Sequence, residues 1–225
     1  MTFHLVGINN QNFVMQDEQT GSWWQQVSGE AIRGPLAGTR LTLIATDQLT
    51  FATWKHETGG HGRVLRPEAR VAARYARADW ERRMRSTPTP ASLSRDGRLA
   101  PRTLVIGIDV GDTSRAYPVD ELPARSVVND DVGGTPIAIV RAPDGRSTRV
   151  FDRRVGSRTL EFVVTERSAF RLTDTATAST WDFSGTAIDG PLKGTRLARL
   201  SWLEEYWFDW HAYHPSTDVA RHVFR

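Results

Sequence analysis

The chain has 225 residues, of which 39% are hydrophobic and 24% charged, and its formal net charge at pH 7 is +3. This composition is typical of a globular protein, and no apolar run approaches the roughly 18 residues of a membrane-spanning helix. Because the chain has no cysteine, it forms no disulfide and offers no thiolate to a catalytic or metal site. Of its 29 basic residues 27 are arginine, and acidic residues interrupt the densest basic run, so we expect a solvated helix face and no nucleic-acid partner.

The densest polar cluster lies near the start of the chain, in "HLVGINNQNF". Asparagine accepts left-handed backbone and stabilises turns, so a β-turn explains the cluster as well as a ligand-binding loop does. The next stretch, residues 13–27, is predicted to be a hairpin with a polar turn at 17–21. Neighbouring side chains of a strand face opposite ways, so one of two adjacent tryptophans is expected in the core and the other partly exposed, where it would stack on a flat ligand or sugar. The candidate ligand-binding residues are His4, Asn9, Asn10, Asn12, Trp23, Gln25 and Glu30.

A long repeat dominates the sequence. "GEAIRGPLAGTRL" at residues 29–41 and "GTAIDGPLKGTRL" at 185–197 agree at ten of thirteen positions, and the similarity extends upstream to Asp17 against Asp174 and Trp24 against Trp181. Similarity at one long offset indicates duplicated domains. Positions on which the copies agree are interpreted as fold. Positions on which they differ, such as Glu30 against Thr186, are where we expect function.

The remaining elements follow from turn and helix signals. The shared "GPLxGTRL" predicts a tight turn that leads into strands at 39–45 and 195–201, because proline fixes φ and glycine permits positive φ. Aromatic spacing predicts short helices at 50–57 and 206–214. We expect residues 1–66 to be the C-terminal half of a first copy, 67–86 a connecting helix, 87–101 a linker, and 102–225 a second, more complete copy. The predicted fold class is mainly β (α+β), with two units of antiparallel hairpins.

Two long motifs of the sequence resemble those of a known family. "VVNDDVGGTPIAIV" and "GSWWQQVSGEAIRGPLAGTRL" are similar to the long motifs of DUF3179, a bacterial and archaeal family of unknown function. Many members carry a cysteine-containing segment close to "CPLCGTA" after the "GTPIAV" strand, where this chain has "RAPDGRSTRVF" at residues 141–151. The resemblance implies that copy two has lost that segment. Because copy one lacks about half of a domain, we expect that Met1 is not the natural start and that a missing segment or an oligomer covers its strand edges.

Two functional hypotheses remain open. The first is a non-catalytic binding or scaffold module, since no triad, phosphate loop or metal motif is present. The alternative is a metal or redox protein whose cysteine segment lies upstream. His211 and His214 have the spacing of metal ligands, but they end a helix, where histidine is favoured without a metal; we assign no metal site, no catalytic residue and no cofactor. The start of the chain has no signal peptide, although members of the family commonly look exported.

Overall fold

The protein is described from a computed structural model, which covers all residues except 10–11, 73–78, 90–95, 167–169, 222–225 and the side chain of Val71. It is mainly β, as predicted, with four sheets of three or four strands and one two-stranded ribbon among the described residues. In the described part of the chain, no helix is long and apolar enough to span a membrane.

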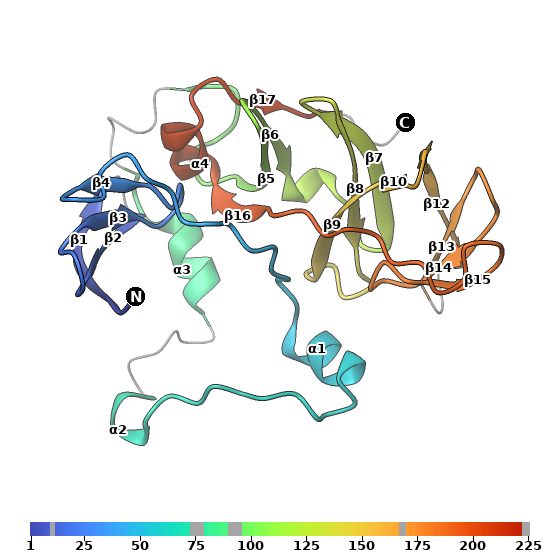
Figure 1. Ribbon diagram of the computed structural model, residues 1–225, viewed down its shortest axis with the longest axis horizontal. Helices are drawn as coiled ribbons and strands as arrows, with labels where there is room; N and C mark the ends of the chain where they lie inside the picture. The colour runs from blue at the N-terminus through green and yellow to red at the C-terminus, as the bar shows by residue number, and fades with distance from the viewer. Residues whose placement is uncertain (10–11, 73–78, 90–95, 167–169, 222–225) are drawn as a thin grey trace.

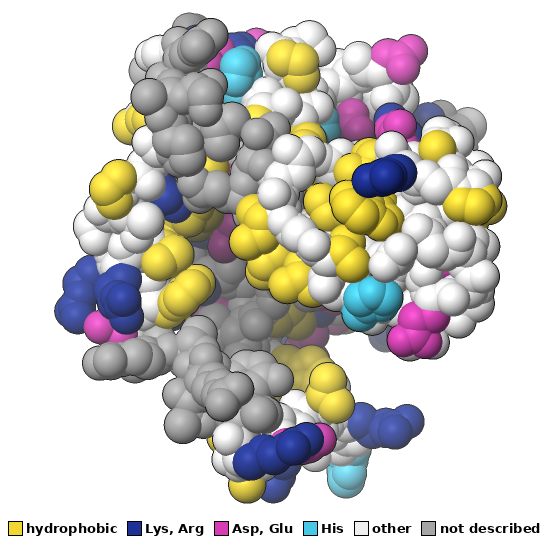
Figure 2. Space-filling model, turned by 90° about the vertical axis from the view of Figure 1, so that its left-hand side faces the viewer, with side chains coloured by type: hydrophobic (Ala, Val, Ile, Leu, Met, Phe, Trp, Pro, Cys, Tyr) yellow, Lys and Arg dark blue, Asp and Glu magenta, His cyan; other side chains and the backbone are white. Residues whose placement is uncertain are grey.

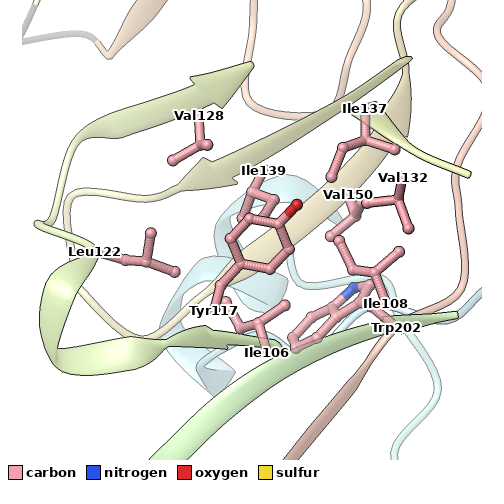
Figure 3. Close-up of a cluster of buried hydrophobic side chains, with 10 residues drawn as sticks. All are labelled: Ile106, Ile108, Tyr117, Leu122, Val128, Val132, Ile137, Ile139, Val150 and Trp202. Atoms are coloured by element: carbon pink, nitrogen blue, oxygen red, sulfur yellow. The ribbon is translucent and has the colours of Figure 1, made fainter. Parts of the chain in front are cut away.

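Two sheets packed face to face form the centre of the molecule (Figure 1). One has the order β16-β5-β6-β17 and the other the order β7-β8-β9. The interface between them is filled by aliphatic side chains together with Tyr117 and Trp202 (Figure 3). The strands are β5 (Leu104–Val110), β6 (Thr113–Pro118), β7 (Ser126–Val132), β8 (Thr135–Arg141), β9 (Thr148–Asp152), β16 (Leu203–Tyr206) and β17 (Asp218–Val219).

Strand β8 is buried on both of its faces. Ile137 and Ile139 point into the central core, whereas Ala138 and Val140 point into a second core on the other side of the sheet. A strand buried on both sides reads as a continuous apolar run, and "PIAIV" is such a run. The second core joins β8 and β9 to a four-stranded sheet made of β12 (Phe162–Glu166), β13 (Arg171–Asp174), β14 (Thr180–Trp181) and β15 (Ala187–Asp189).

Helix α4 (Trp207–Tyr213) covers the outer face of the β5–β6 pair. Its Trp207 and Trp210 pack on Val105 and Ala116. Any side chain at Gly107 would lie about 2.3 Å from the Trp210 indole, so the glycine is what lets the ring lie on the strand. Helix α4 confirms the helix predicted from the aromatic spacing of residues 206–214, and Trp207 and Trp210 are core residues.

A third four-stranded sheet lies at the opposite end of the molecule from β12–β15 (Figure 1). It consists of β1 (Phe3–Asn9), β2 (Asn12–Asp17), β3 (Trp23–Gln25) and β4 (Ala31–Arg33), paired in chain order. The two end sheets have matching registers: Phe3 pairs with Asp17 in one, and Phe162 with Asp174 in the other. The predicted hairpin over residues 13–27 is confirmed as β2 and β3. We call residues 3–41 the first unit and residues 162–197 the second unit.

The same polar cluster lies inside both units. In the first, Asp17 accepts hydrogen bonds from the backbone and hydroxyl of Thr20 and, at 2.8 Å, from Nε1 of Trp24. Burial alone raises the pKa of Asp17, but the hydrogen bonds from Trp24, Thr20 and Ser22 outweigh it and lower the pKa to about 2. The second unit repeats the arrangement with Asp174, Thr177 and Trp181.

The glycine that follows the fourth strand of each unit is a steric requirement. Gly34 has a φ of +98°, and a Cβ there would lie 2.7 Å from the Cα of Ser22; Gly190 stands in the same relation to Ser179. The turn then closes with a 2.9 Å bond from the Ala31 amide to the Thr39 carbonyl. The strands predicted after these turns, at 39–45 and 195–201, are wrong. Both segments make only isolated bridges, and neither pairs with a neighbouring strand over consecutive residues.

Between the end sheet and β5 lie three short helices, α1 (Phe51–Glu57), α2 (Ala69–Ala72) and α3 (Trp80–Ser86). Helix α1 confirms the predicted helix at 50–57. Of the helix expected over 67–86, α2 and α3 are described and residues 73–78 between them lie outside the described residues, so the single helix stays a prediction. Neither α1 nor α3 buries a residue. Part of the expected linker, residues 90–95, lies outside the described residues.

Candidate ligand-binding cavity

A cavity of about 750 Å³ lies where β16 and the end of β8 meet α3 and the segment before α1. Its lining is part apolar and part charged. The apolar and aromatic lining residues are Leu49, Phe51, Trp80, Met84, Leu104, Val119 and Tyr206. The charged ones are Asp47, Glu81, Arg85, Arg141, Arg146, Glu204 and Glu205. Pockets for small molecules have this mixture of apolar walls and a few polar groups.

Arg141 is the most unusual residue of the cavity. It ends β8 and is only 4% exposed. Its guanidinium donates to Oγ1 of Thr148 at 2.9 Å and to the carbonyl of Gly145, but its buried Nε has no hydrogen-bond partner among the described residues. Burial lowers the pKa of Arg141, and the charges of Glu204 and Asp144 only partly oppose this. A buried cation with a free donor is the feature that an anionic ligand would satisfy.

The loop after β8 holds Arg141 in place. Asp144 accepts hydrogen bonds from the hydroxyls of Ser147, Thr50 and Thr53, at 2.6, 2.7 and 2.8 Å. Burial acts to raise the pKa of Asp144, but these bonds and two backbone amides dominate and lower it. The ionised Asp144 thus ties the loop to the start of α1, which forms another wall of the cavity.

Two adjacent carboxyls of β16 line the same cavity. Burial raises the pKa of Glu204, and the positive charge of Arg141 opposes the shift. Burial, together with the negative charge of Asp209 and a hydrogen bond to it, raises the pKa of Glu205 to about 8. At neutral pH Glu205 is therefore a neutral acid that can donate a hydrogen bond.

Asp209 links this pair to the first unit. Burial raises its pKa, while hydrogen bonds from Asn12 and Glu205 act in the other direction. Nδ2 of Asn12 lies 2.8 Å from Oδ1 of Asp209, and both side chains are buried. Nearby, the hydroxyl of Tyr213 donates to the carbonyl of Asn9 at 2.7 Å. These bonds fix the end sheet β1–β4 against α4.

The wall that contains Asp47 is held by Arg149 of β9. The guanidinium of Arg149, almost completely buried, makes two bonds to Asp47 and two to Glu57, at 2.6 to 3.0 Å. It also stacks on the ring of Phe183, 4.6 Å from its centre. Bidentate pairing of this kind fixes orientation as well as charge.

The candidate residues of the sequence analysis lie around a different feature. Gln25 and Glu30 line a second cleft, of about 690 Å³, between the first unit and the β5–β6 pair. Glu30 is paired with Arg40 at 3.1 Å, and Gln25 hydrogen-bonds to Tyr213. Asn12 is structural, because its amide bonds Asp209.

The other candidates do not join that cleft. Trp23 lies half-buried beneath the guanidinium of Arg33, opposite the buried Trp24, so the two tryptophans face opposite ways as predicted. His4 and Asn9 are exposed on β1. Asn10 lies outside the described residues. The set is therefore distributed over both faces of the end sheet and is not gathered at one point.

The two spaced histidines have separate partners. Nε2 of His211 lies 3.1 Å from Asp96, and Nδ1 of His214 lies 3.1 Å from the carbonyl of Trp210. Burial lowers the pKa of His214. In the described ranges of the chain, no group of three or more histidine and acidic side chains is placed to hold a metal ion.

Sequence reasoning missed the residues of the large cavity. "WLEEYW" contains two adjacent acids within an aromatic run, which is a detectable signal, since charges are rare between core aromatics. Arg141 belongs to the segment that replaces the cysteine-containing stretch expected from the family resemblance, so that segment lines the cavity.

Comparison with protein families gives one result. The family described as "Protein of unknown function (DUF3179)" matches residues 1–217, nearly the whole chain. Comparisons with curated proteins and with solved structures found no match. The match agrees with the motifs at 127–140 and 21–41, and it covers both the end sheet β1–β4 and the central sheets. The chain therefore belongs to the DUF3179 family.

Proposed function

We propose that the protein is a binding module for small organic acids, which would occupy the cavity beside Arg141. The observation that carries the proposal is the buried guanidinium of Arg141, which lines a cavity of about 750 Å³ and whose Nε has no hydrogen-bond partner among the described residues. A ligand carboxylate supplies the missing acceptor, and a charge-assisted bond in a dry site is strong.

The rest of the cavity suits the other parts of such a ligand. Phe51, Trp80 and Tyr206 offer an apolar enclosure for an aromatic or aliphatic body. The carboxyl of Glu205, whose proton is donated to Asp209, is neutral at pH 7 and therefore does not repel an anion. The ligand class is thus a monocarboxylate with a planar or branched apolar body.

We also propose that the two units descend from one duplicated domain. Matching registers, the repeated Asp–Thr–Trp cluster and the repeated glycine contact support this interpretation. In this view the cavity is formed mainly by the second copy, and the segment after the first unit closes it.

Binding is tested by titration calorimetry with phenylacetate and indole-3-acetate as probes. Phenethylamine and phenethyl alcohol are the matched controls, since they keep the aromatic body and lack the carboxylate. We expect the acids to bind and the controls not to bind. Arg141→Met should reduce the affinity for the acids roughly tenfold or more, because a charge-assisted hydrogen bond is lost.

The control variant is Arg158→Met, which removes an exposed arginine of β11 (Arg158–Thr159) away from the cavity. It should bind the probes as the wild type does. Equal binding of phenethylamine and phenylacetate, or full affinity in Arg141→Met, would contradict the proposal.

A further inference from the structure

The cleft of about 690 Å³ between the first unit and the β5–β6 pair contains a second group of polar side chains. Asp109 of β5 and Ser114 of β6 both line it and stand directly opposite each other in the strand register. Side chains at opposite positions of an antiparallel pair share one face of the sheet, so these two lie side by side. That face is the one on which α4 lies, because Gly107, two residues before Asp109, contacts Trp210.

His214 completes the group from the end of α4. Its ring stacks on the indole of Trp210, with ring centres 3.7 Å apart and planes inclined by 16°. Nδ1 lies 3.1 Å from the carbonyl oxygen of Trp210, and because a carbonyl only accepts, Nδ1 carries the proton. Burial lowers the pKa of His214, so the ring is neutral at pH 7. Nε2 is therefore a hydrogen-bond acceptor whose orientation is fixed by the stacked ring.

The carboxylate of Asp109 and Nε2 of His214 are two acceptors held close together. Oδ2 of Asp109 lies 3.9 Å from Nε2, which is too long for a hydrogen bond, and neither atom has a proton to offer the other. The hydroxyl of Ser114 has no hydrogen-bond partner within the described part of the chain, although the residue is only 8% exposed. A molecule with two neighbouring donors that also accepts from Ser114 would satisfy all three groups.

The first unit supplies the opposite wall of the cleft. Hydrophobic side chains gather on the end of the molecule that carries this unit (Figure 2), but the loop that lines the cleft is polar and includes Gln25, Gln26 and Ser28. Glu30 and Arg40 line the same wall, and their ion pair at 3.1 Å balances the two charges. This wall therefore offers amides and hydroxyls without a net charge.

The distribution of charge favours an uncharged ligand. The carboxylates of Asp109 and Asp112 are exposed, so water screens their charge and they act mainly as hydrogen-bond acceptors. Among the described lining residues no unpaired cation is present at pH 7 that would attract an anion. The buried lining residues are neutral, and they are Gln25, Ser114, Trp202 and Trp210. Hydroxyl, amide and carboxylate groups beside aromatic rings match a sugar, whose hydroxyls donate and accept and whose C–H groups pack on apolar side chains.

We propose that this cleft binds a neutral carbohydrate, and that Asp109, Ser114 and His214 bind two adjacent hydroxyls of one sugar ring. Asp109 and His214 accept the two hydroxyl protons, and the hydroxyl of Ser114 donates to a sugar oxygen. Leu41 and Trp202, which line the same cleft, offer apolar surface to the C–H groups of the ring. In the described chain this site shares no lining residue with the cavity beside Arg141 and does not depend on the function proposed for it.

Saturation-transfer NMR with the full chain tests the proposal. The probes are the methyl α-glycosides of glucose, mannose and galactose, which together present adjacent hydroxyls in both cis and trans arrangements. We expect at least one of them to bind, whereas cyclohexylmethanol, which keeps a six-membered ring and lacks adjacent hydroxyls, should not. Absence of binding by all three glycosides, or equal binding of cyclohexylmethanol, would overturn the proposal. Binding of putrescine alone would assign the cleft to cations and would overturn it as well.

Three substitutions place the bound sugar. Asp109→Ala, Ser114→Ala and His214→Phe should each weaken binding of the glycoside roughly tenfold, because each removes one hydrogen bond, and phenylalanine keeps the stack on Trp210. Asp189→Ala, at an exposed position of β15, is the matched control and should bind as the wild type does.

The fold of these variants is checked separately by urea unfolding. Asp109 is exposed and Ser114→Ala removes a single oxygen atom, so both variants should keep the unfolding midpoint of the wild type to within a small change. Full affinity for the glycoside in folded Asp109→Ala and Ser114→Ala would show that the sugar binds elsewhere and would overturn the assignment of this cleft.

Discussion

Nε1 of Trp181 donates a 2.9 Å hydrogen bond to Oδ2 of Asp174, and both side chains are completely buried. The same carboxylate accepts from the hydroxyl and the backbone amide of Thr177. One carboxyl side chain therefore accepts from three donors within the second unit, and the first unit repeats the arrangement around Asp17. This cluster, and not a catalytic group, accounts for the aspartate shared by the two copies.

Replacing Asp174 with alanine should destabilise the protein by about 3 kcal/mol, because the indole N–H and the Thr177 donors lose a buried acceptor. Urea unfolding followed by tryptophan fluorescence measures the change. Asp189→Asn, at an exposed position on the neighbouring strand β15, is the control and should stay within about 0.5 kcal/mol of the wild type. Equal effects of the two substitutions would show that the cluster does not stabilise the fold.

Glu205→Gln should remove a pH dependence of stability. The pKa of Glu205 is raised to about 8 in the folded protein, against about 4.5 in the unfolded chain. Between these values the unfolded chain is ionised and the folded protein holds its proton, so folding stability falls as pH rises from about 4.5 to about 8. The glutamine variant should therefore gain up to a few kcal/mol relative to the wild type at pH 8 and little at pH 4.

Unfolding free energies at several pH values from 4 to 8.5 provide this comparison. Glu161→Gln, at an exposed position just before β12, serves as the control and should run parallel to the wild type. A constant difference between Glu205→Gln and the wild type across the range would show that Glu205 is ionised in the folded protein.

Phe170 and Phe13 offer a matched pair of substitutions. Phe170→Ala should destabilise the protein by about 3 to 5 kcal/mol, because it leaves a cavity beside Phe183 and Leu172. Phe13→Ala should change stability by less than about 1 kcal/mol, since the side chain is half exposed. Similar costs at the two positions would show that the first unit is covered within the chain itself.

Arg149→Met should release the segment that contains α1. Asp47 and Glu57 lose their shared partner, and breaking a buried ion pair on one side costs about 3 kcal/mol. We expect faster tryptic cleavage after Lys55, measured by mass spectrometry against time. Adding Asp47→Asn and Glu57→Gln to the variant should restore much of the protection, because the unpaired charges are then gone. If trypsin cleaves the wild type after Lys55 as fast as it cleaves Arg149→Met, the ion pairs of Arg149 do not hold the α1 segment.

Local features of this fold could be predicted from the sequence. The hairpin around residues 17–21, the opposite faces of Trp23 and Trp24, and the helices at 51–57 and 207–213 depend on neighbours in the chain, and the residue pattern determines them. The strands after the "GTRL" turns were wrong because strand pairing depends on a partner far away. Residues 39–45 have the composition of a strand but meet a partner at one position only.

The candidate cavity could not be predicted for the same reason. Its walls come from segments near residues 47, 80, 104, 141 and 204, which only the folded chain brings together. Arg141 is one of 27 arginines, and nothing in its immediate neighbours indicates that it is buried. Glu204 and Glu205 were nearer to being recognised, since two adjacent acids between Trp202 and Trp207 conflict with an apolar environment.

Strand β8 places a constraint on how this protein can change over generations. Ile137 and Ile139 belong to one core, and Ala138 and Val140 belong to the other, so the two cores share this strand. A one-residue insertion or deletion within the strand would turn the side chains that follow it to the opposite face of the sheet, and would therefore disrupt the packing of both cores at once. A substitution that keeps the length of the strand affects only the core that the substituted side chain faces. We therefore expect that related sequences keep the number of residues between 135 and 141, whereas substitutions at the positions facing one core occur independently of those at the positions facing the other.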